Sequence, residues 1–316
     1  MHHKRPFRIT GKELNFGFNP HPRQTPFQEI TMSKVWFITG ASSGFGRALS
    51  EAVLSRGDRA VLAARRLEML QPVVAQYPET ALAVSLDVTD PMARGQAVGR
   101  ALDRFTRIDV LANIAGRGSL GAAEEFSPDQ LREQMEVNFF SAAELTRAVL
   151  PTMRAQGSGH ILQLTSIGGL ASFPAFAPYC ASKYALEGWS EALAGEVKSF
   201  GIKVTIVEPG AFRTEFAGAG NMRPAQRIEA YRPVIEPVEQ YLYGNDGKQP
   251  GDPAKAADAM MKVVDSENPP MRLLLGEDAI GLWEMKRNMV ETDIAAWRQI
   301  GEATAFEGMK VAPVGG

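Results

Sequence analysis

The chain has 316 residues, of which 45% are hydrophobic and 22% charged, and its 34 basic and 36 acidic residues give a net charge of −2. This is the composition of a globular protein with a large core, without the basic excess that attracts nucleic acid. The single cysteine, Cys180, excludes an internal disulfide framework. Only His160 lies beyond residue 21 among the histidines, so we expect neither a multi-histidine metal site nor a Ser-His-Asp hydrolase.

Residues 1–31 form the first segment and differ from the rest of the chain. They contain four prolines and no sustained periodicity, which predicts a disordered or loosely attached tail. We interpret Met32 as the natural start and residues 32–316 as a single domain. No apolar stretch is long enough to predict a membrane span, and the N-terminus lacks the apolar core of a signal peptide, so the expected location is cytoplasmic.

From residue 34 onward, short apolar runs alternate with longer segments of helical spacing. The runs are nearly continuous in apolar residues, as expected of strands buried on both faces of a sheet. This alternation predicts an α/β fold, a single Rossmann-like doubly wound parallel sheet of about seven strands with helices on both faces. The expected strands are residues 35–39, 60–64, 81–86, 108–112, 160–165, 204–207 and 271–275, and the main expected helices are 47–56, 91–105, 128–153 and 179–200.

Residues 216–253 interrupt this rhythm. They contain five prolines and three tyrosines, in a place where the pattern would otherwise continue with a strand or helix. An excursion of this length is usually functional, so the pattern predicts a substrate loop or lid. A C-terminal helical segment is expected after it.

A glycine-rich turn follows the first predicted strand. It runs Thr39-Gly40-Ala41-Ser42-Ser43-Gly44-Phe45-Gly46 and leads into a helix. Glycines let the chain turn sharply and let a pyrophosphate approach the backbone, while the helix N-terminus supplies free N–H groups and a partial positive charge. The turn therefore predicts a dinucleotide site, although glycines in a tight turn also have a purely steric explanation.

The second predicted strand ends at Ala64, followed by Arg65 and Arg66. An NAD site expects a carboxylate near this point to bind the ribose 2′-hydroxyl, whereas an arginine pairs with the 2′-phosphate of NADP. We therefore expect NADP(H) as the preferred cofactor and leave NAD(H) open. The competing interpretation is that both arginines are simply solvated.

Tyr179 and Lys183 lie four residues apart at the start of a predicted helix, so their side chains share a face. The ordinary pKa of a phenol, about 10, is too high for a base at neutral pH, and a nearby lysine cation would lower it. Ser166 follows the fifth predicted strand, at the edge where such sheets bind ligands. Taken singly, the tyrosine and lysine also fit an interface aromatic and a surface charge.

Taken together, these motifs resemble the short-chain dehydrogenase/reductase superfamily, in its compact, non-extended branch. The resemblance covers residues 33 to about 280. It rests on the glycine turn, Asp87-Val88, Asn113-x-Ala115-Gly116, Asn138, Ser166, Tyr179-x-x-x-Lys183, and Pro209-Gly210 with Thr214, in that order. Two departures are Ile114, where the family often has a second asparagine, and Glu208, where it usually has a small or neutral residue.

The resemblance implies a role for each matching residue. Tyr179 would be the general acid/base, Lys183 would lower its pKa and hold the nicotinamide ribose, Ser166 would orient the substrate oxygen, and Asn138 would complete a proton relay through water. The implied cofactor-binding set is Gly40, Ser42, Ser43, Gly44, Phe45, Gly46, Arg65, Asp87, Val88, Asn113, Ala115, Gly116, Tyr179, Lys183, Pro209, Gly210, Phe212 and Thr214.

The sequence thus predicts an NADP(H)-dependent oxidoreductase that transfers a hydride between nicotinamide and a carbonyl or secondary alcohol. Apolar residues expected around the substrate, including Leu170, Phe173, Phe176 and Phe216, favour a lipophilic ketone or aldehyde. The alternative is a non-catalytic NADP-binding regulatory or scaffold protein on the same fold. The family resemblance also implies a homodimer or homotetramer, paired through helices 128–153 and 179–200.

Overall fold

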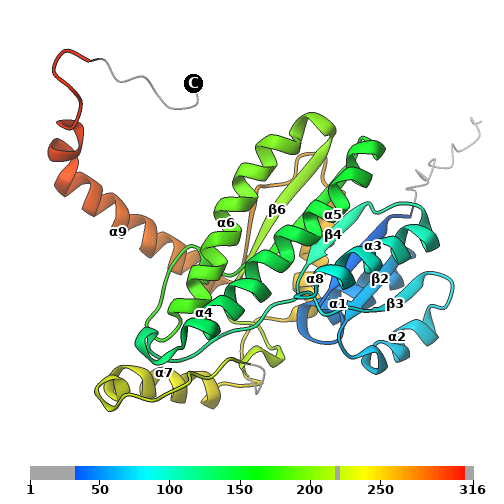
Figure 1. Ribbon diagram of the computed structural model, residues 1–316, viewed down its shortest axis with the longest axis horizontal. Coiled ribbons are helices and arrows are strands. Elements are labelled where there is room, and N and C mark those ends of the chain that lie inside the picture. The colour runs from blue at the N-terminus through cyan, green and yellow to red at the C-terminus, as the bar shows by residue number, and fades with distance from the viewer. Residues whose placement is uncertain (1–32, 218–220, 310–316) are drawn as a thin grey trace, which may run out of the picture. The chain divides into compact units, whose positions relative to one another are not determined.

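The computed structural model describes residues 33–217 and 221–309, and it contains one seven-stranded parallel sheet (Figure 1). The strand order is β3-β2-β1-β4-β5-β6-β7, and every neighbouring pair is parallel. This confirms the predicted fold class. The strands are β1 (Val35–Thr39), β2 (Arg59–Ala64), β3 (Ala81–Ser85), β4 (Val110–Asn113), β5 (Gly159–Leu164), β6 (Ile202–Pro209) and β7 (Arg272–Leu275).

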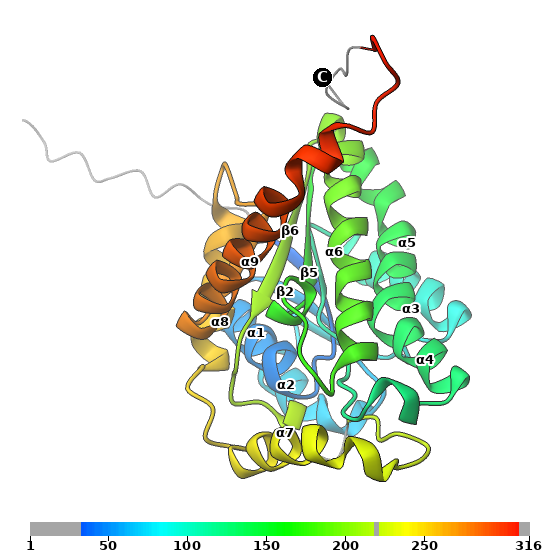
Figure 2. The same ribbon diagram turned by 90° about the vertical axis from the view of Figure 1, so that its left-hand side faces the viewer.

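Each central strand is apolar on both faces because helices cover both. Trp36 and Ile38 of β1 pack into one core layer, whereas Val35 and Phe37 pack into the other. The first layer is closed by α1 (Gly44–Ser55), α2 (Gln71–Gln76) and α8 (Pro253–Asp265), and the second by α3 (Pro91–Phe105), α5 (Ser141–Gln156) and α6 (Ala177–Val197). Figure 2 shows the two sets of helices on opposite sides of the strands.

The chain adds strands first on one side of β1 and then on the other, so the strand order has a switch point between β1 and β4. From β1 the chain moves outward through β2 and β3, then returns past β1 to β4 and continues to β7. Parallel sheets bind ligands outside the carboxyl ends of their strands at such a switch point. The fold therefore places a binding crevice next to the glycine turn, which follows β1.

The predicted helix over 128–153 is divided in the structure. It consists of α4 (Pro128–Met135), a π-helical turn over Glu136–Phe140, and α5. Single π-helical turns of this kind occur frequently at functional sites, because they rotate one side chain out of the regular helical spacing. Asn138 lies in this turn.

The excursion over 216–253 is partly helical rather than an open loop. It includes α7 (Arg232–Gly244), whose Ile235 packs with Leu120 and Ala175 in a small separate core. The last helix of the described residues is α9 (Glu277–Glu302), the predicted C-terminal helical segment. No helix in the two described stretches has the length and apolarity that crossing a membrane requires. The predicted tail over 1–31 lies outside the described residues.

Candidate active site

Thr39, the last residue of β1, fixes the floor of the crevice. Its hydroxyl donates to the carbonyl of Ala112 at 3.3 Å and accepts from the N–H groups of Ile114 at 2.8 Å and Ala115 at 3.0 Å. The side chain therefore joins the ends of β1 and β4 at the switch point. Ala115 of the predicted cofactor set is thereby held beside the glycine turn.

The glycines of the turn are required by its geometry. Gly40 and Gly44 have φ of 65° and 51°, a region in which side chains other than glycine are strained. A Cβ on Gly46 would overlap the carbonyl oxygen of Gly40, so α1 packs against the turn only because position 46 is glycine. A Cβ on Gly44 would lie 3.3 Å from Thr214, which brings that predicted residue to the same turn.

The N-terminus of α1 has the features of an anion site. Ser43 stands at the N-cap but makes no side-chain hydrogen bond, and the first turn of the helix contains no acidic residue. The first backbone N–H groups are thus left without a side-chain acceptor, and the helix dipole favours a negative charge there. This arrangement fits a pyrophosphate group.

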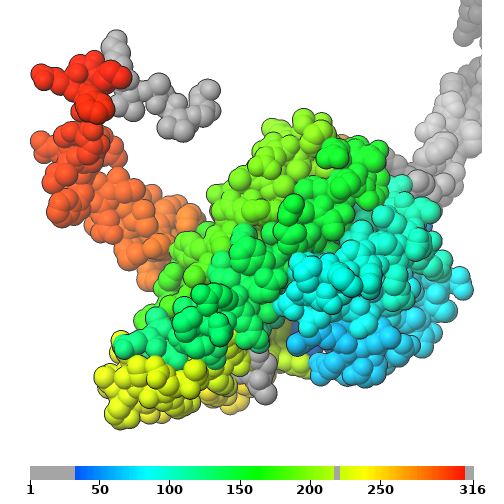
Figure 3. All heavy atoms as spheres, viewed as in Figure 1, coloured from blue at the N-terminus to red at the C-terminus, as the bar shows by residue number. Residues whose placement is uncertain are grey.

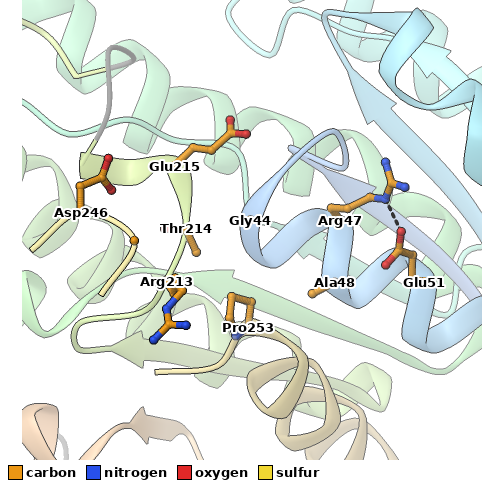
Figure 4. Close-up of a pocket in the computed structure, with 10 residues that line it drawn as sticks. Gly44, Arg47, Ala48, Glu51, Arg213, Thr214, Glu215, Asp246 and Pro253 are labelled. Atoms are coloured by element: carbon orange, nitrogen blue, oxygen red, sulfur yellow. Dashed lines mark hydrogen bonds and ion pairs between the residues drawn. The ribbon is translucent and has the colours of Figure 1, made fainter. Parts of the chain in front are cut away.

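A cavity of about 510 Å³ lies beside this N-terminus. Figure 4 shows Gly44 and Ala48 of α1 on one side and Arg213, Thr214 and Pro253 on the other. Arg47 also lines the cavity but is paired with Glu51, as the dashed line in the figure shows. The cavity contains two residues of the predicted cofactor set, Gly44 and Thr214, and does not extend to Tyr179.

Arg65 and Asp87 lie near each other, after β2 and β3. The N–H and hydroxyl of Thr89 and the charge of Arg65 together hold the pKa of Asp87 below its usual range. Both Arg65 and Asp87 are exposed. Val88, the next residue, accepts through its carbonyl from Arg94 at 2.7 Å, so the loop after β3 is anchored to α3.

Asn113 occupies a structural position rather than an open wall of the crevice. Its buried amide donates to the carbonyl of Ala142 at 3.2 Å, to the hydroxyl of Thr146 at 3.0 Å and to the side-chain oxygen of Gln163 at 3.0 Å. This network joins β4, β5 and α5. Ile114, the departure from the family pattern, is partly buried and packs at the edge of the first core layer.

Tyr179, Ser166 and Lys183 come together at the carboxyl end of β5. Tyr179 is buried, and the Ser166 hydroxyl lies near enough to its phenol to lower the pKa of that phenol. Gly168 allows this approach, since a Cβ there would lie 3.1 Å from the Tyr179 ring and 3.4 Å from the Ser166 oxygen. Lys183 Nζ donates to the carbonyl of Leu164 at 2.8 Å and lies 5.8 Å from the centre of the Tyr179 ring.

The pKa of Tyr179 differs from the expectation. Burial raises the pKa of the phenol, and the nearby Ser166 hydroxyl offsets this only in part. Lys183 does not lower it here, because burial also lowers the pKa of Lys183, to about 8, and the ammonium points to Leu164. The tyrosine in this structure is thus a phenol that retains its proton at neutral pH.

Asn138 links the crevice to the tyrosine helix. Its amide donates to Ser182 Oγ and to the carbonyl of Arg117, each at 2.9 Å, and its Oδ1 accepts from the N–H of Arg117. The side chain is therefore fully engaged in holding the loop after β4 against α6, with no hydrogen bond to Lys183. A Cβ on Gly116 would lie 3.1 Å from Asn138 and 3.6 Å from Lys183 Nζ, so Gly116 keeps this corner open.

The segment after β6 lies across the crevice from the glycine turn. Gly210 donates to the carbonyl of Leu275 at 2.9 Å, and a Cβ on it would collide with Asp278. The Phe212 ring packs against Phe45, with ring centres 5.0 Å apart. Phe212 therefore lies beside the glycine turn with the cofactor set, and Pro209 is buried at the end of β6.

Two aromatic rings stand next to Tyr179. The centre of the Phe216 ring is 5.4 Å from that of Tyr179, and the centre of the Phe176 ring is 6.4 Å from it. Phe216 comes from the predicted lid and is 38% exposed. Its ring therefore separates the tyrosine from solvent, while one side of the Phe216 ring remains exposed. Arg223, further along the same segment, stacks on Tyr243, with its guanidinium carbon 4.5 Å from the ring centre.

Sequence reasoning left Glu208 without an explanation, and the structure supplies one. Glu208 of β6 is fully buried and paired with Arg272 of β7, which also pairs with Glu187 and Glu191 of α6. Glu187 and Glu208 thus place two buried carboxyl groups on the same guanidinium, close enough for each charge to act on the other. Burial and the neighbouring Glu187 accordingly raise the pKa of Glu208 to about 7.

A second buried ion pair was also missed. Glu125, fully buried, accepts from the N–H groups of Ala122 and Ile228 at 2.8 Å and pairs with Arg232 at 3.3 Å. It therefore fastens the start of α7 to the loop after β4. Nothing in the spacing of these residues along the sequence indicates the contact, because they are 107 positions apart.

Comparison with known proteins agrees with this geometry. The family model described as "short chain dehydrogenase" matches residues 34–224. The chain belongs to the short-chain dehydrogenase family. It is an oxidoreductase, and it is 38% identical over 275 residues to the oxidoreductase BOA17 of Botryotinia fuckeliana, covering 87% of this chain and all of that protein.

Solved structures of this family resemble the fold closely. A short-chain dehydrogenase from Streptomyces avermitilis superposes with a TM-score of 0.82 at 45% identity, covering 87% of this chain and 100% of that one. A metagenomic short-chain oxidoreductase in complex with NADP superposes with a TM-score of 0.61 at 25% identity, covering 77% of this chain and 96% of that one.

Proposed function

We propose that this short-chain dehydrogenase is an NADP(H)-dependent carbonyl reductase that acts on lipophilic ketones or aldehydes. The observation that carries the proposal is the buried Tyr179 phenol, beside Ser166 and one helical turn from Lys183, at the edge of a crevice with an open helix N-terminus. A bound nicotinamide would supply or accept the hydride. The residues of the chain would supply orientation and the proton.

The crevice fits a dinucleotide. The uncapped N-terminus of α1 and the glycine turn would hold the pyrophosphate, with Thr214 beside them. Arg65 would pair with a 2′-phosphate and Asp87 would lie near the adenine. The NADP complex of the metagenomic relative supports a nicotinamide cofactor, and the arginine in place of a carboxylate supports NADP over NAD.

The protonated state of Tyr179 at neutral pH supports the reductive direction. A phenol that keeps its proton at neutral pH is a general acid, and it would transfer that proton to the carbonyl oxygen as a hydride reaches the carbon. The carbonyl then becomes an alcohol and the tyrosine a phenolate. Lys183, whose pKa is about 8, still carries charge at neutral pH, and it would stabilise that phenolate by turning its ammonium from the Leu164 carbonyl towards Tyr179.

Ser166 and Asn138 would have supporting roles. The Ser166 hydroxyl lies beside the phenol, so it would orient a substrate oxygen that binds there to receive the proton. Asn138 would act as a positioning residue for the loop over Arg117 and for Ser182, since its amide is fully used by these partners.

The apolar substrate class rests on Phe216 and Phe176 beside the tyrosine. Rings at this place favour a substrate with hydrocarbon next to its carbonyl group. We also propose that the protein is cytoplasmic, that it forms a homo-oligomer and that it has no nucleic-acid partner.

The decisive experiment is NADPH oxidation by the full chain with a panel of ketones, aldehydes and quinones graded in hydrocarbon length. We expect turnover, with kcat/KM rising along the lipophilic series and NADPH preferred over NADH. NADPH binding without turnover of any panel member would instead support the alternative, a regulatory or scaffold protein that retains the fold.

A further inference from the structure

The C-terminal helix α9 leaves most of its surface without a partner. Within the described residues only Ala279 of its 26 residues is buried. Figure 1 shows the helix extending away from the sheet, and the space-filling view in Figure 3 shows it surrounded by solvent on the face presented there. A helix this long normally buries one apolar stripe against the core.

An apolar stripe is nevertheless present on α9. At 3.6 residues per turn, eight large apolar side chains fall on one half of the helix, and six of them are between 38% and 67% exposed. We call these residues the α9 stripe, and they are Leu282, Trp283, Met285, Met289, Val290, Ile294, Trp297 and Ile300. Trp297 is 67% exposed, which is costly for a side chain of that size.

Only two charged residues interrupt the stripe, Lys286 and Asp293. They are opposite in sign and seven residues apart, and neither has an ion-pair partner among the described residues. Four charges on the other half of α9 are paired within the helix: Arg287 with Glu291 at 3.8 Å and Arg298 with Glu302 at 3.0 Å. Glu284, on that other half, also has no ion-pair partner among the described residues, but Lys286 and Asp293 are the two unpartnered charges of opposite sign that lie within the stripe.

This pattern is self-complementary. If two copies of α9 pack antiparallel about a twofold axis between Met289 and Val290, Lys286 of each copy faces Asp293 of the other. The same register sets Trp297 of one copy against Leu282 of the other. A twofold interface uses the same patch on both copies, so any group in the patch needs its complement elsewhere in the patch. Lys286 and Asp293 meet that requirement.

We infer that the α9 stripe binds a second copy of this chain, as an antiparallel helix pair with two intermolecular Lys286–Asp293 ion pairs. The charge of the helix argues against an anionic membrane as the occupant, because α9 carries six acidic and three basic residues. The paired stretch is about 30 Å long, a small interface, so the dimer should depend on protein concentration. This contact differs from a pairing through α5 and α6.

Charge reversal in the full chain tests the register. Lys286→Asp and Asp293→Lys each place like charges opposite one another, so each variant alone should dissociate at concentrations where the wild type is dimeric. The double variant restores both ion pairs and should dimerise again. Mixing the two single variants should also restore dimers, because one then supplies only acidic and the other only basic partners. Sedimentation velocity measures all four cases.

Glu284→Lys is the matched control, since Glu284 is an exposed charge on the other half of the helix. It should leave the dimer unchanged, and thermal unfolding of each variant shows that the fold is intact. Dimerisation that is indifferent to Lys286→Asp and Asp293→Lys would overturn the inference. A wild-type protein that stays monomeric would also overturn the inference. This holds whether or not the protein binds phosphatidylcholine/phosphatidylglycerol vesicles in a flotation assay.

Cross-linking tests the proximity directly. Val290→Cys sets two thiols beside the proposed axis, and the natural Cys180 is buried, so mild oxidation should yield a disulfide-linked dimer. Asn288→Cys, on the other half of the helix, should remain unlinked. Equal cross-linking of both variants would contradict the proposed packing. Neither sedimentation nor cross-linking depends on catalysis, so the proposed reductase activity and this interface are tested independently.

Discussion

Arg65 and Arg66 are adjacent, exposed and of the same charge, but only Arg65 exerts a resolved effect on Asp87. We expect Arg65→Ala to weaken NADPH binding by about tenfold or more, the worth of one charge-assisted hydrogen bond, and to change NADH binding much less. Arg66→Ala is the matched control. Fluorescence titration with both cofactors measures the ratio, and equal losses for NADPH and NADH would remove the argument for cofactor preference.

His160 is a buried titratable residue away from the active site. Its Nε2 lies 3.0 Å from the Thr205 hydroxyl, which itself donates to the carbonyl of Pro270, so the imidazole is the donor. Burial, with the charges of Lys203 and Lys34, lowers the pKa of His160 from 6.5 to about 4. The fold therefore favours the neutral ring, and this preference stabilises the protein fully above pH 6.5 and is lost as the pH falls towards 4.

We therefore expect His160→Gln, which keeps an amide donor but cannot titrate, to remove one source of acid sensitivity. The wild type should lose up to about 3 kcal/mol of unfolding free energy relative to the variant between pH 6.5 and pH 4. Urea unfolding at several pH values measures this difference. A difference that does not vary with pH would show that His160 is protonated with its ordinary pKa in the folded protein.

At the scale of elements, Arg272 joins β7, β6 and α6 through three carboxylates. We expect Arg272→Met to destabilise the fold by about 3–5 kcal/mol, because it leaves Glu208 and Glu187 buried without a cation. Adding Glu208→Gln to this variant should recover part of the loss. Double-mutant analysis of urea unfolding measures the coupling, and strictly additive effects would contradict an interaction between Arg272 and Glu208.

The segment around Phe216 is the element that closes over the tyrosine. We expect Phe216→Ala to raise KM for lipophilic carbonyl substrates while leaving the NADPH dissociation constant unchanged, because the ring contacts Tyr179 and not the glycine turn. Phe200→Ala, at an exposed ring on another element, is the control. If both variants have the same kinetics as the wild type, Phe216 does not line the substrate site.

At the scale of the whole molecule, the sequence predicted what depends on local patterns. Apolar runs such as 35–39 gave the strands correctly, because helices on both faces demand residues that are apolar on both sides. The glycine turn was predictable for a similar reason, since Gly46 has room for no side chain. The positions of Ser166, Tyr179 and Lys183 at one strand end followed from the same topology.

The remaining features depend on contacts between distant residues or on burial. No spacing indicates that Glu125 meets Arg232 or that Glu208 meets Arg272, because tertiary packing brings these pairs together. The pKa of Tyr179 was expected to fall because Lys183 is near in sequence, but burial outweighs that charge when the ammonium points to Leu164. Periodicity also missed the π-helical turn that orients Asn138.

The account as a whole depends on Tyr179 as the proton donor, and Tyr179→Phe tests this most directly. The variant removes one oxygen from a buried ring and leaves the glycine turn intact. We predict that single-turnover NADPH oxidation with a carbonyl substrate of the wild type falls by about 10²–10⁴-fold, while NADPH binds with nearly unchanged affinity. A Tyr179→Phe variant that oxidises NADPH at the wild-type rate would contradict the account.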